Sequence, residues 1–261
     1  FRIGTVNSIN FGRVSAQIVY YVWAWLRMTD AVPAAERAAF EISVTVPSGN
    51  FGNICSGHLA RSMGVPIRRL VLATNENNVL DEFFSTGIYR PRVSAETFET
   101  SSPSMDISKA SNLERFIFDV LGRDPEALAV AWSTLDRDGE LDLSAELARF
   151  TEEFGFVGGA SSHADRVATI RDAFDRHGEL IDPHTADGIT VARRYLEPGV
   201  PMLVLETAKP AKFPDIMVEA IGSAAPIPAH LAGLLDLPQR VVELPADESA
   251  LREIIRTNAV L

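Results

Sequence analysis

The amino-acid sequence predicts an α/β fold that is built on an open sheet and carries a mostly helical insertion. Residues 41–84 read in turn as strand, loop, helix, strand and helix, which is the rhythm of an open α/β sheet. Residues 104–177 show mostly helical patterns and no convincing strand, and an apolar strand pattern returns later. We therefore expect three parts, namely an α/β part over residues 1–103, the helical insertion over 104–180, and an α/β part over 181–261 that completes the first.

The first part opens with a predicted helix over residues 14–26, whose large apolar side chains lie nearly all round it and predict burial. Residues 41–46 alternate and are β-branched, which is typical of a strand that ends at Pro47. The turn-forming residues 48–53 follow this strand. The remaining elements of this part are a helix over 54–63 that Gly64 ends, a strand over 67–73 and a helix over 77–84.

Helical periodicity dominates the middle of the chain, and strand patterns return near its end. The predicted helices of the insertion cover residues 113–121, 125–132, 144–154 and 164–176. The last part is predicted to hold a helix that follows residues 182–184 and runs to about Tyr195, strands over 201–206 and 240–244, and a helix over 248–256.

Composition narrows the class of protein. The chain has 261 residues, is 46% hydrophobic and carries a formal net charge of −11, so a buried core is expected and non-specific binding to nucleic acid or anionic membranes is disfavoured. Cys55 is the only cysteine, which excludes an intrachain disulfide and a cysteine-rich zinc site. No apolar run approaches the roughly 20 residues that span a bilayer. A reducing, cytoplasmic location is therefore expected.

The loop over residues 48–53 carries the strongest local signal. A strand that feeds a glycine-bearing loop and then a helix presents unpaired N–H groups at the start of that helix, where the helix dipole also favours an anion. Gly49 and Gly52 lack a Cβ, so a phosphate could approach the backbone closely without any lysine. An ordinary strand-to-helix turn that uses glycine for its geometry remains the alternative interpretation.

Other chemistries find less support. The sequence holds no nucleophile elbow, no lysine-bearing phosphate loop and no dinucleotide fingerprint after a strand. Residues 134–141 imitate a calcium loop, but its first and twelfth positions would be Thr134 and Ala145, so calcium is rejected. The five histidines show no ligand spacing, and we expect no metal site. We interpret each histidine as a polar surface residue or a satisfied buried one.

Six short blocks in the same order together resemble the threonine synthase family, in the branch found in microbes and fungi. They cover nearly the whole chain, and the resemblance lies in the six blocks being in register. The blocks are residues 6–10 with Arg13, 47–53, 73–77, 102–108, 182–186 and 206–214.

This resemblance implies the tryptophan-synthase-β-like fold, fold type II, and a pyridoxal 5'-phosphate-dependent lyase that converts O-phosphohomoserine and water to threonine and phosphate. It implies that a loop holds the cofactor phosphate through its backbone amides, and that Thr207 meets the pyridine nitrogen. It also suggests a set of residues near the substrate phosphate, of which an arginine has the donor fork suited to an oxyanion; for Arg13 a surface ion pair remains the alternative. The implied cofactor residues of the loop are Gly49, Asn50, Phe51 and Gly52. The implied substrate residues are Asn7, Ser8, Asn10 and Arg13.

The sequence departs from the family in its lysines. The resemblance places the Schiff-base lysine upstream of the Asn7–Asn10 block, in a segment that these residues do not include. Lys109, Lys209 and Lys212, the three lysines present, belong to other blocks and do not match it. We therefore expect no catalytic residue in this chain, and we expect the chain alone to be inactive, as the C-terminal part of such an enzyme.

Two alternatives remain open. One is another fold type II lyase, of the cysteate synthase or deaminase type. The other is a non-catalytic module that binds a phosphorylated metabolite. We also expect the helix over 14–26 to pack, through Ile18, Tyr21 and Trp25, against a missing N-terminal segment, and its exposure to promote self-association.

Overall fold

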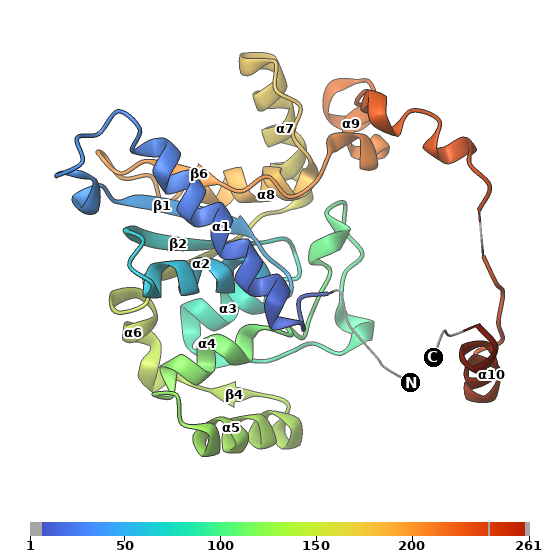
Figure 1. Ribbon diagram of the computed structural model, residues 1–261, viewed down its shortest axis with the longest axis horizontal. Helices are drawn as coiled ribbons and strands as arrows, with labels where there is room; N and C mark the ends of the chain where they lie inside the picture. Colours follow the sequence, from blue (N-terminus) through green and yellow to red (C-terminus); the bar gives the residue numbers. More distant parts are fainter. Residues whose placement is uncertain (1–6, 240, 259–261) are drawn as a thin grey trace.

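The computed structural model describes residues 7–239 and 241–258 as an α/β body followed by an extended C-terminal stretch (Figure 1). The strands are β1 (Ile42–Pro47), β2 (Ile67–Thr74), β3 (Ile88–Tyr89), β4 (Leu141–Asp142), β5 (Phe156–Ala160) and β6 (Met202–Val204). The α-helices are α1 (Phe11–Met28), α2 (Gly52–Ser62), α3 (Val79–Thr86), α4 (Leu113–Val120), α5 (Pro125–Asp138), α6 (Leu147–Glu152), α7 (His163–His177), α8 (Pro183–Ala192), α9 (Pro214–Ile221) and α10 (Glu248–Asn258).

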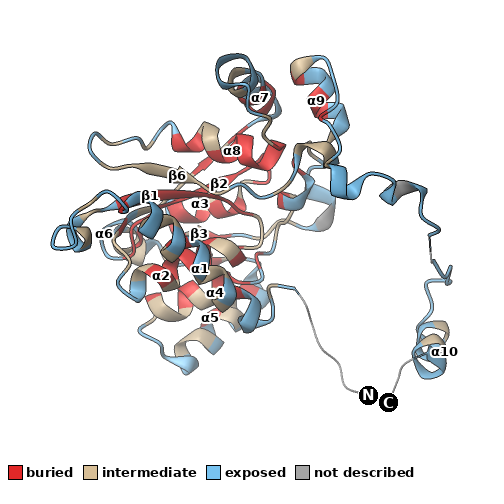
Figure 2. Cartoon of the chain, turned by 45° about the horizontal axis from the view of Figure 1, so that its top comes forward, coloured by how far each residue is buried: buried red, intermediate tan, exposed pale blue. Residues whose placement is uncertain are grey.

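The central sheet is parallel and has the order β5-β2-β1-β6. Every residue of β1 is buried, because helices cover both faces of the sheet, as is usual for parallel sheets. Figure 2 shows α8, with α7 beyond it, on one face, and α2 with α1 and α4 on the other. This arrangement confirms the predicted α/β class with an open sheet.

The strand β5 corrects the expectation that the helical insertion contains no strand. Residues 104–180 do fold into α4, α5, α6 and α7, but they also hold the short strand β4, and β5 pairs in parallel with β2 at the edge of the central sheet. Its two glycines conceal it in the sequence, although tight packing requires them. A Cβ on Gly158 would lie 2.9 Å from Asp81 Oδ1, and one on Gly159 would lie 2.7 Å from Val191 Cγ1. The three-part division of the chain stays a prediction.

The strand predicted over 240–244 is wrong. Arg240 lies outside the described residues, and residues 241–244 are exposed and pair with no described strand. Val241 and Val242 have strand propensity, but propensity alone does not make a strand without a partner. Beyond α9 the chain runs away from the α/β body to α10, which has no buried residue (Figure 1).

The helix α1 is less buried than the sequence predicts. Tyr21 is buried and its hydroxyl donates to the Asn53 side chain at 2.7 Å, while Ile18 and Trp25 pack against the core. The opposite face, which includes Val19 and Trp23, is exposed. Ile18, Tyr21 and Trp25, which were expected to pack against a missing segment, therefore already pack within this chain. Other apolar residues of the same helix are the exposed ones.

No helix within the described residues is both long enough and apolar enough to cross a lipid bilayer.

Candidate functional site

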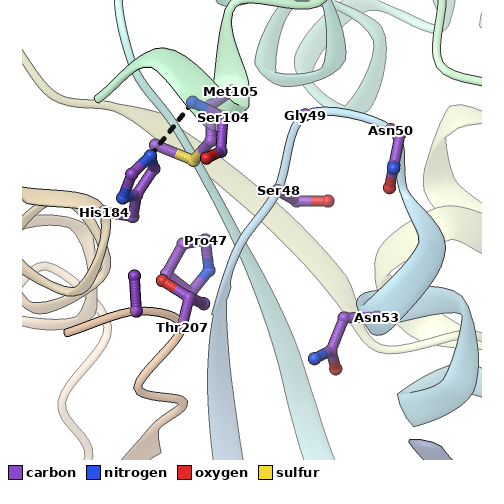
Figure 3. Close-up of a pocket in the computed structure, with 10 residues that line it drawn as sticks. Pro47, Ser48, Gly49, Asn50, Asn53, Ser104, Met105, His184 and Thr207 are labelled. Carbon is purple, nitrogen blue, oxygen red and sulfur yellow. Dashed lines mark hydrogen bonds between the residues drawn. The ribbon is translucent and has the colours of Figure 1, made fainter. Parts of the chain in front are cut away.

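A cavity of about 140 Å³ lies at the carboxyl ends of β1 and β6 (Figure 3). From β1 the chain adds β2 and then β5 on one side, and it returns to place β6 on the other side. In open α/β sheets, ligands bind where the direction of strand addition reverses in this way. The residues that line the cavity are Pro47, Ser48, Gly49, Asn50, Asn53, Ser104, Met105, His184, Thr207 and Ala208.

The loop between β1 and α2 is anchored by Phe51. This residue has φ 65°, a left-handed conformation that is unusual for a residue other than glycine. Its side chain is fully buried and stacks on Phe84 and Phe156, with ring centroids 5.8 and 5.6 Å apart. Such strain persists only where the surroundings over-determine it. The aromatic core therefore holds the loop in a conformation that turns its backbone toward the cavity.

Backbone N–H groups of this loop are available as donors. The N–H groups of Gly49, Asn50 and Phe51 have no acceptor among the residues that the structure describes. The N–H of Gly52 does have one, because it donates to Asn50 Oδ1 at 2.9 Å. Of the four loop residues singled out from the sequence, Gly49 and Asn50 line the cavity, Phe51 anchors the loop, and Gly52 closes it.

Gly49 faces the opposite wall at very close range. A Cβ at this position would lie 2.9 Å from Met105 Cα, so any larger residue would push into backbone. That wall is held by Asp106, whose Oδ1 accepts from Asn75 Nδ2 at 2.8 Å and from Asn77 Nδ2 at 2.9 Å. Because the wall is fixed by a buried polar network, the width of the cavity beside Gly49 is fixed as well.

Thr207 and His184 form the other end of the cavity. The Thr207 N–H donates to Thr185 Oγ1 at 3.3 Å. His184 Nε2 accepts from the Ser104 N–H at 3.1 Å, the dashed line in Figure 3. Thr207 was expected here, whereas His184 was missed by sequence reasoning. The available signal was the Asp182–Pro183 pair at the start of a helix, which places His184 in the first turn.

The predicted substrate residues lie beside the loop, and one of them touches it. Ser8 Oγ accepts from Asn50 Nδ2 at 3.1 Å. Asn10 caps α1 by accepting from the Gly12 N–H at 2.9 Å, and Asn7 Oδ1 accepts from the Ile9 N–H at 3.1 Å. Arg13 is exposed in the first turn of α1. Asn7, Ser8, Asn10 and Arg13 are not among the ten residues that line the cavity.

The electrostatics of the cavity favour a small anion. Its ten lining residues include no Asp, Glu, Lys or Arg, so neither a carboxylate nor a fixed side-chain cation dominates. The N-terminus of the 11-residue helix α2 supplies a positive dipole end, and the loop supplies backbone donors. Residues 7–239 and 241–258 contain no group of three or more metal-binding side chains placed to hold a metal ion.

The lysines lie elsewhere. Lys109 Nζ is 3.2 Å from Asp136 Oδ1, and Lys209 Nζ is 2.8 Å from Glu206 Oε1. The hydrogen bond and charge of Glu206 raise the pKa of Lys209, so this amine stays protonated at neutral pH. Lys212 borders a different cavity, beside Phe213. None of the three lines the cavity at the carboxyl ends of β1 and β6.

Comparison with known proteins shows which proteins this chain resembles. A family model described as "Threonine synthase, C-terminal" matches residues 185–255. The chain is 52% identical over 259 residues to a threonine synthase of Methylobacillus glycogenes, and 54% identical over 257 residues to one of Corynebacterium glutamicum. Each match covers 97% of this chain and 52% of the relative.

A solved structure agrees. The crystal structure of a threonine synthase from Brucella melitensis, described as bound to pyridoxal phosphate, has a TM-score of 0.88 and 37% identity. That match covers 97% of this chain and 52% of the solved one, and it confirms the predicted fold type II architecture. This chain spans about half the length of the curated relatives it matches. By sequence and by fold, the chain is similar to the C-terminal portion of threonine synthases.

Proposed function

We propose that this chain forms the cofactor-phosphate half of a pyridoxal 5'-phosphate-dependent threonine synthase. The reaction proposed for the complete enzyme is the conversion of O-phosphohomoserine and water to threonine and phosphate. The observation that carries the proposal is the set of N–H groups on Gly49, Asn50 and Phe51, which have no acceptor in the described part of the chain and border a cavity at the strand-order reversal.

These residues fit the phosphate of the cofactor. Backbone N–H groups bind a charged oxygen with about 1.5–3 kcal/mol each. The helix α2 begins at the same loop and adds the favourable end of its dipole. Gly49 has no side chain to block the approach of an anion to the backbone. In this proposal Gly52 and Asn50 keep the loop in shape through the hydrogen bond between them.

Thr207 fits the ring end of the cofactor. It follows β6, whose pairing with β1 places it in the same cavity as Gly49. When bound, pyridoxal phosphate supplies an electron sink for the substrate. The Thr207 hydroxyl can donate or accept a hydrogen bond without carrying charge. A neutral partner of this kind would not enforce protonation of the ring nitrogen as a carboxylate would.

The substrate phosphate is assigned to the turn before α1. Ser8 is tied to the loop by Asn50, and Asn10 and Arg13 begin the helix that follows. We propose that Asn7, Ser8, Asn10 and Arg13 bind the substrate phosphate, because a guanidinium and neutral polar groups at a helix start suit an oxyanion.

A Schiff-base lysine is proposed to lie on polypeptide outside these 261 residues. The three lysines of the chain do not line the cavity, and relatives of about twice this length provide room for such a segment. The chain alone would then lack the amine that forms the covalent link and moves the proton. We accordingly propose that it is inactive by itself. We also propose a cytoplasmic location, supported by the single, buried Cys55.

A chimera tests this proposal. The portion of the Methylobacillus glycogenes relative that this chain does not match can be joined to the chain, and phosphate release from O-phosphohomoserine measured with added cofactor. We expect turnover by the chimera, none by the 261-residue chain, and a loss of at least tenfold in a Gly49→Ala chimera. Turnover by the 261-residue chain alone would contradict the assignment of the lysine.

The same chimera separates the alternative functions. A cysteate synthase or deaminase would act on O-phosphoserine or serine in preference to O-phosphohomoserine. A module that only binds a phosphorylated metabolite would show binding without turnover of any of the three substrates. The proposal is supported only if O-phosphohomoserine has the highest kcat/KM.

A further inference from the structure

Asp182 is a buried carboxylate that three donors share. It caps α8, and its Oδ1 accepts from the His184 N–H at 3.0 Å and from His184 Nδ1 at 2.7 Å. Its Oδ2 accepts from the Thr185 hydroxyl. Burial alone would raise the pKa of Asp182, but the hydrogen bonds from His184 and Thr185 outweigh burial and lower it. Asp182 is therefore an acceptor only.

His184 connects Asp182 to one wall of the cavity through hydrogen bonds on both ring nitrogens. Its Nε2 accepts from the Ser104 N–H at 3.1 Å. A backbone amide can only donate, and the Asp182 carboxylate only accepts, so the imidazole is neutral and its proton is on Nδ1. The edge of the ring also packs against Phe213, with ring centroids 5.0 Å apart. Ser104 is thus held at a fixed place opposite the Gly49 loop.

Thr185 connects Asp182 to the other wall of the cavity through its hydroxyl group. Since its hydroxyl proton points to Asp182, a lone pair is free to accept the Thr207 N–H at 3.3 Å. Thr207 is itself exposed, and its neighbour Glu206 is exposed and pairs with Lys209. The hydrogen bond to Thr185 therefore ties the Thr207 backbone to α8 beside the cavity.

We propose that Asp182 is a positioning residue that sets where Thr207 and Ser104 lie around the bound cofactor. It acts through Thr185 on one side and through His184 on the other. This inference rests on the proposed function and deepens it. Asp182 has no role in holding the phosphate, which is assigned to the loop after β1, so its loss should affect the ring of the cofactor and spare the phosphate.

An Asp182→Asn variant tests this separation. His184 and Thr185 donate to different oxygens of Asp182, and an amide keeps an oxygen at only one of these two positions and places an NH₂ donor at the other, so it cannot accept from both. The matched control is Asp124→Asn, because Asp124 also caps a helix, α5, that begins with a proline. Asp124 is exposed and does not line the cavity. Both variants lose a capping carboxylate, but only Asp182→Asn disturbs the cavity walls.

The measurement is calorimetric titration of the 261-residue chain with pyridoxal phosphate and, separately, with inorganic phosphate. We expect Asp182→Asn to weaken pyridoxal phosphate binding at least tenfold and to change phosphate binding less than twofold, while Asp124→Asn changes neither. Thr185→Val should also weaken pyridoxal phosphate binding, and Thr185→Ser should restore it. This pair keeps the test available if Asp182→Asn does not fold.

A spectroscopic readout reports the positioning itself. The ¹⁵N chemical shifts of the His184 ring distinguish the Nδ1–H form from the alternative tautomer, and we expect Asp182→Asn to abolish the pure Nδ1–H signature. If Asp182→Asn weakens the binding of pyridoxal phosphate and of inorganic phosphate equally, or weakens neither, the inference is overturned and the proposed function stands. If the unaltered chain binds pyridoxal phosphate no better than inorganic phosphate, the proposed function fails and this inference fails with it.

Discussion

Asn50 and Ser8 join the two predicted halves of the site, because Asn50 Nδ2 lies 3.1 Å from Ser8 Oγ. The same Asn50 side chain accepts the Gly52 N–H through its oxygen. One amide therefore links the phosphate loop to the turn before α1 and also closes the loop on itself. A substitution in the phosphate loop should therefore also change the turn before α1, and a substitution in that turn should change the loop.

Replacing Asn50 tests this link. Asn50→Ala removes two hydrogen bonds that are worth about 0.5–1.5 kcal/mol each, so it should lower the free energy of unfolding by about 1–3 kcal/mol. It should also weaken phosphate binding, because the loop loses its internal bond. Ser8→Ala removes only the bond to the turn, and should cost half as much or less. The measurements are urea unfolding and phosphate titration, and equal costs for the two variants would count against the link.

Gly49 should tolerate no side chain. Gly49→Ala places a Cβ 2.9 Å from Met105 Cα, so the loop and the wall must separate. We expect phosphate binding to fall at least tenfold. The control is Gly178→Ala at the end of α7, where φ is +70° and nothing lies within 4 Å. That substitution costs about 1 kcal/mol of stability through its backbone conformation but should leave phosphate binding unchanged.

The buried Asp187 should make stability fall as the pH rises. Burial raises its pKa to about 7, although the Arg166 guanidinium, 3.1 Å away, opposes the rise. The folded carboxyl therefore holds its proton more tightly than the unfolded one, whose pKa is about 3.9. Its contribution to stability is complete below about pH 4 and is lost as the pH passes through 7.

Urea unfolding of the unaltered chain and of Asp187→Asn, from pH 5 to 8, measures this contribution. The unfolding free energy of the variant minus that of the unaltered chain should increase with pH, by about 1.4 kcal/mol for each unit of pKa difference traversed. Asp165→Asn should show a constant difference over this range, because hydrogen bonds from Ser162 lower the pKa of Asp165 and this carboxyl is ionised in both the folded and the unfolded state above about pH 5. A flat difference for Asp187→Asn would show that this carboxyl is ionised throughout.

The outer face of α1 should promote self-association. Val19 is 62% exposed and Trp23 57%, and they lie one helical turn apart. Contiguous exposed apolar surface favours association. We expect the 261-residue chain to sediment as a concentration-dependent mixture, and Val19→Glu with Trp23→Glu to shift it toward monomer. Val130→Glu on α5, where Val130 is 66% exposed, is the matched control and should change nothing. A chain that is monomeric at every concentration would refute this expectation.

Sequence patterns predicted the elements whose formation depends on neighbouring residues in the chain. The alternation before Pro47 and the glycine-bearing loop after it gave β1 and the start of α2 to within a few residues. Gly158 and Gly159 concealed β5, because glycine is depleted in strands and the reason for it here is contact with Asp81 and Val191. That contact is formed between distant segments and leaves no local signal.

The site was predicted where it depends on backbone and missed where it depends on packing. Gly49 and Thr207 lie far apart in the sequence, but both were named because the family resemblance includes the blocks 47–53 and 206–214, which contain them. His184 was missed because its role depends on a bond to Ser104, 80 residues away. The fixed width of the cavity likewise depends on Asp106 and its partners, and no periodicity in the sequence reports it.

Amide chemical shifts test the central claim most directly. The ¹⁵N-labelled chain can be titrated with pyridoxal phosphate and, in parallel, with pyridoxal, which lacks the phosphate. The account predicts that the N–H protons of Gly49, Asn50 and Phe51 shift downfield with pyridoxal phosphate and stay in place with pyridoxal. Equal shifts with both compounds, or shifts confined to amides outside this loop, would contradict it.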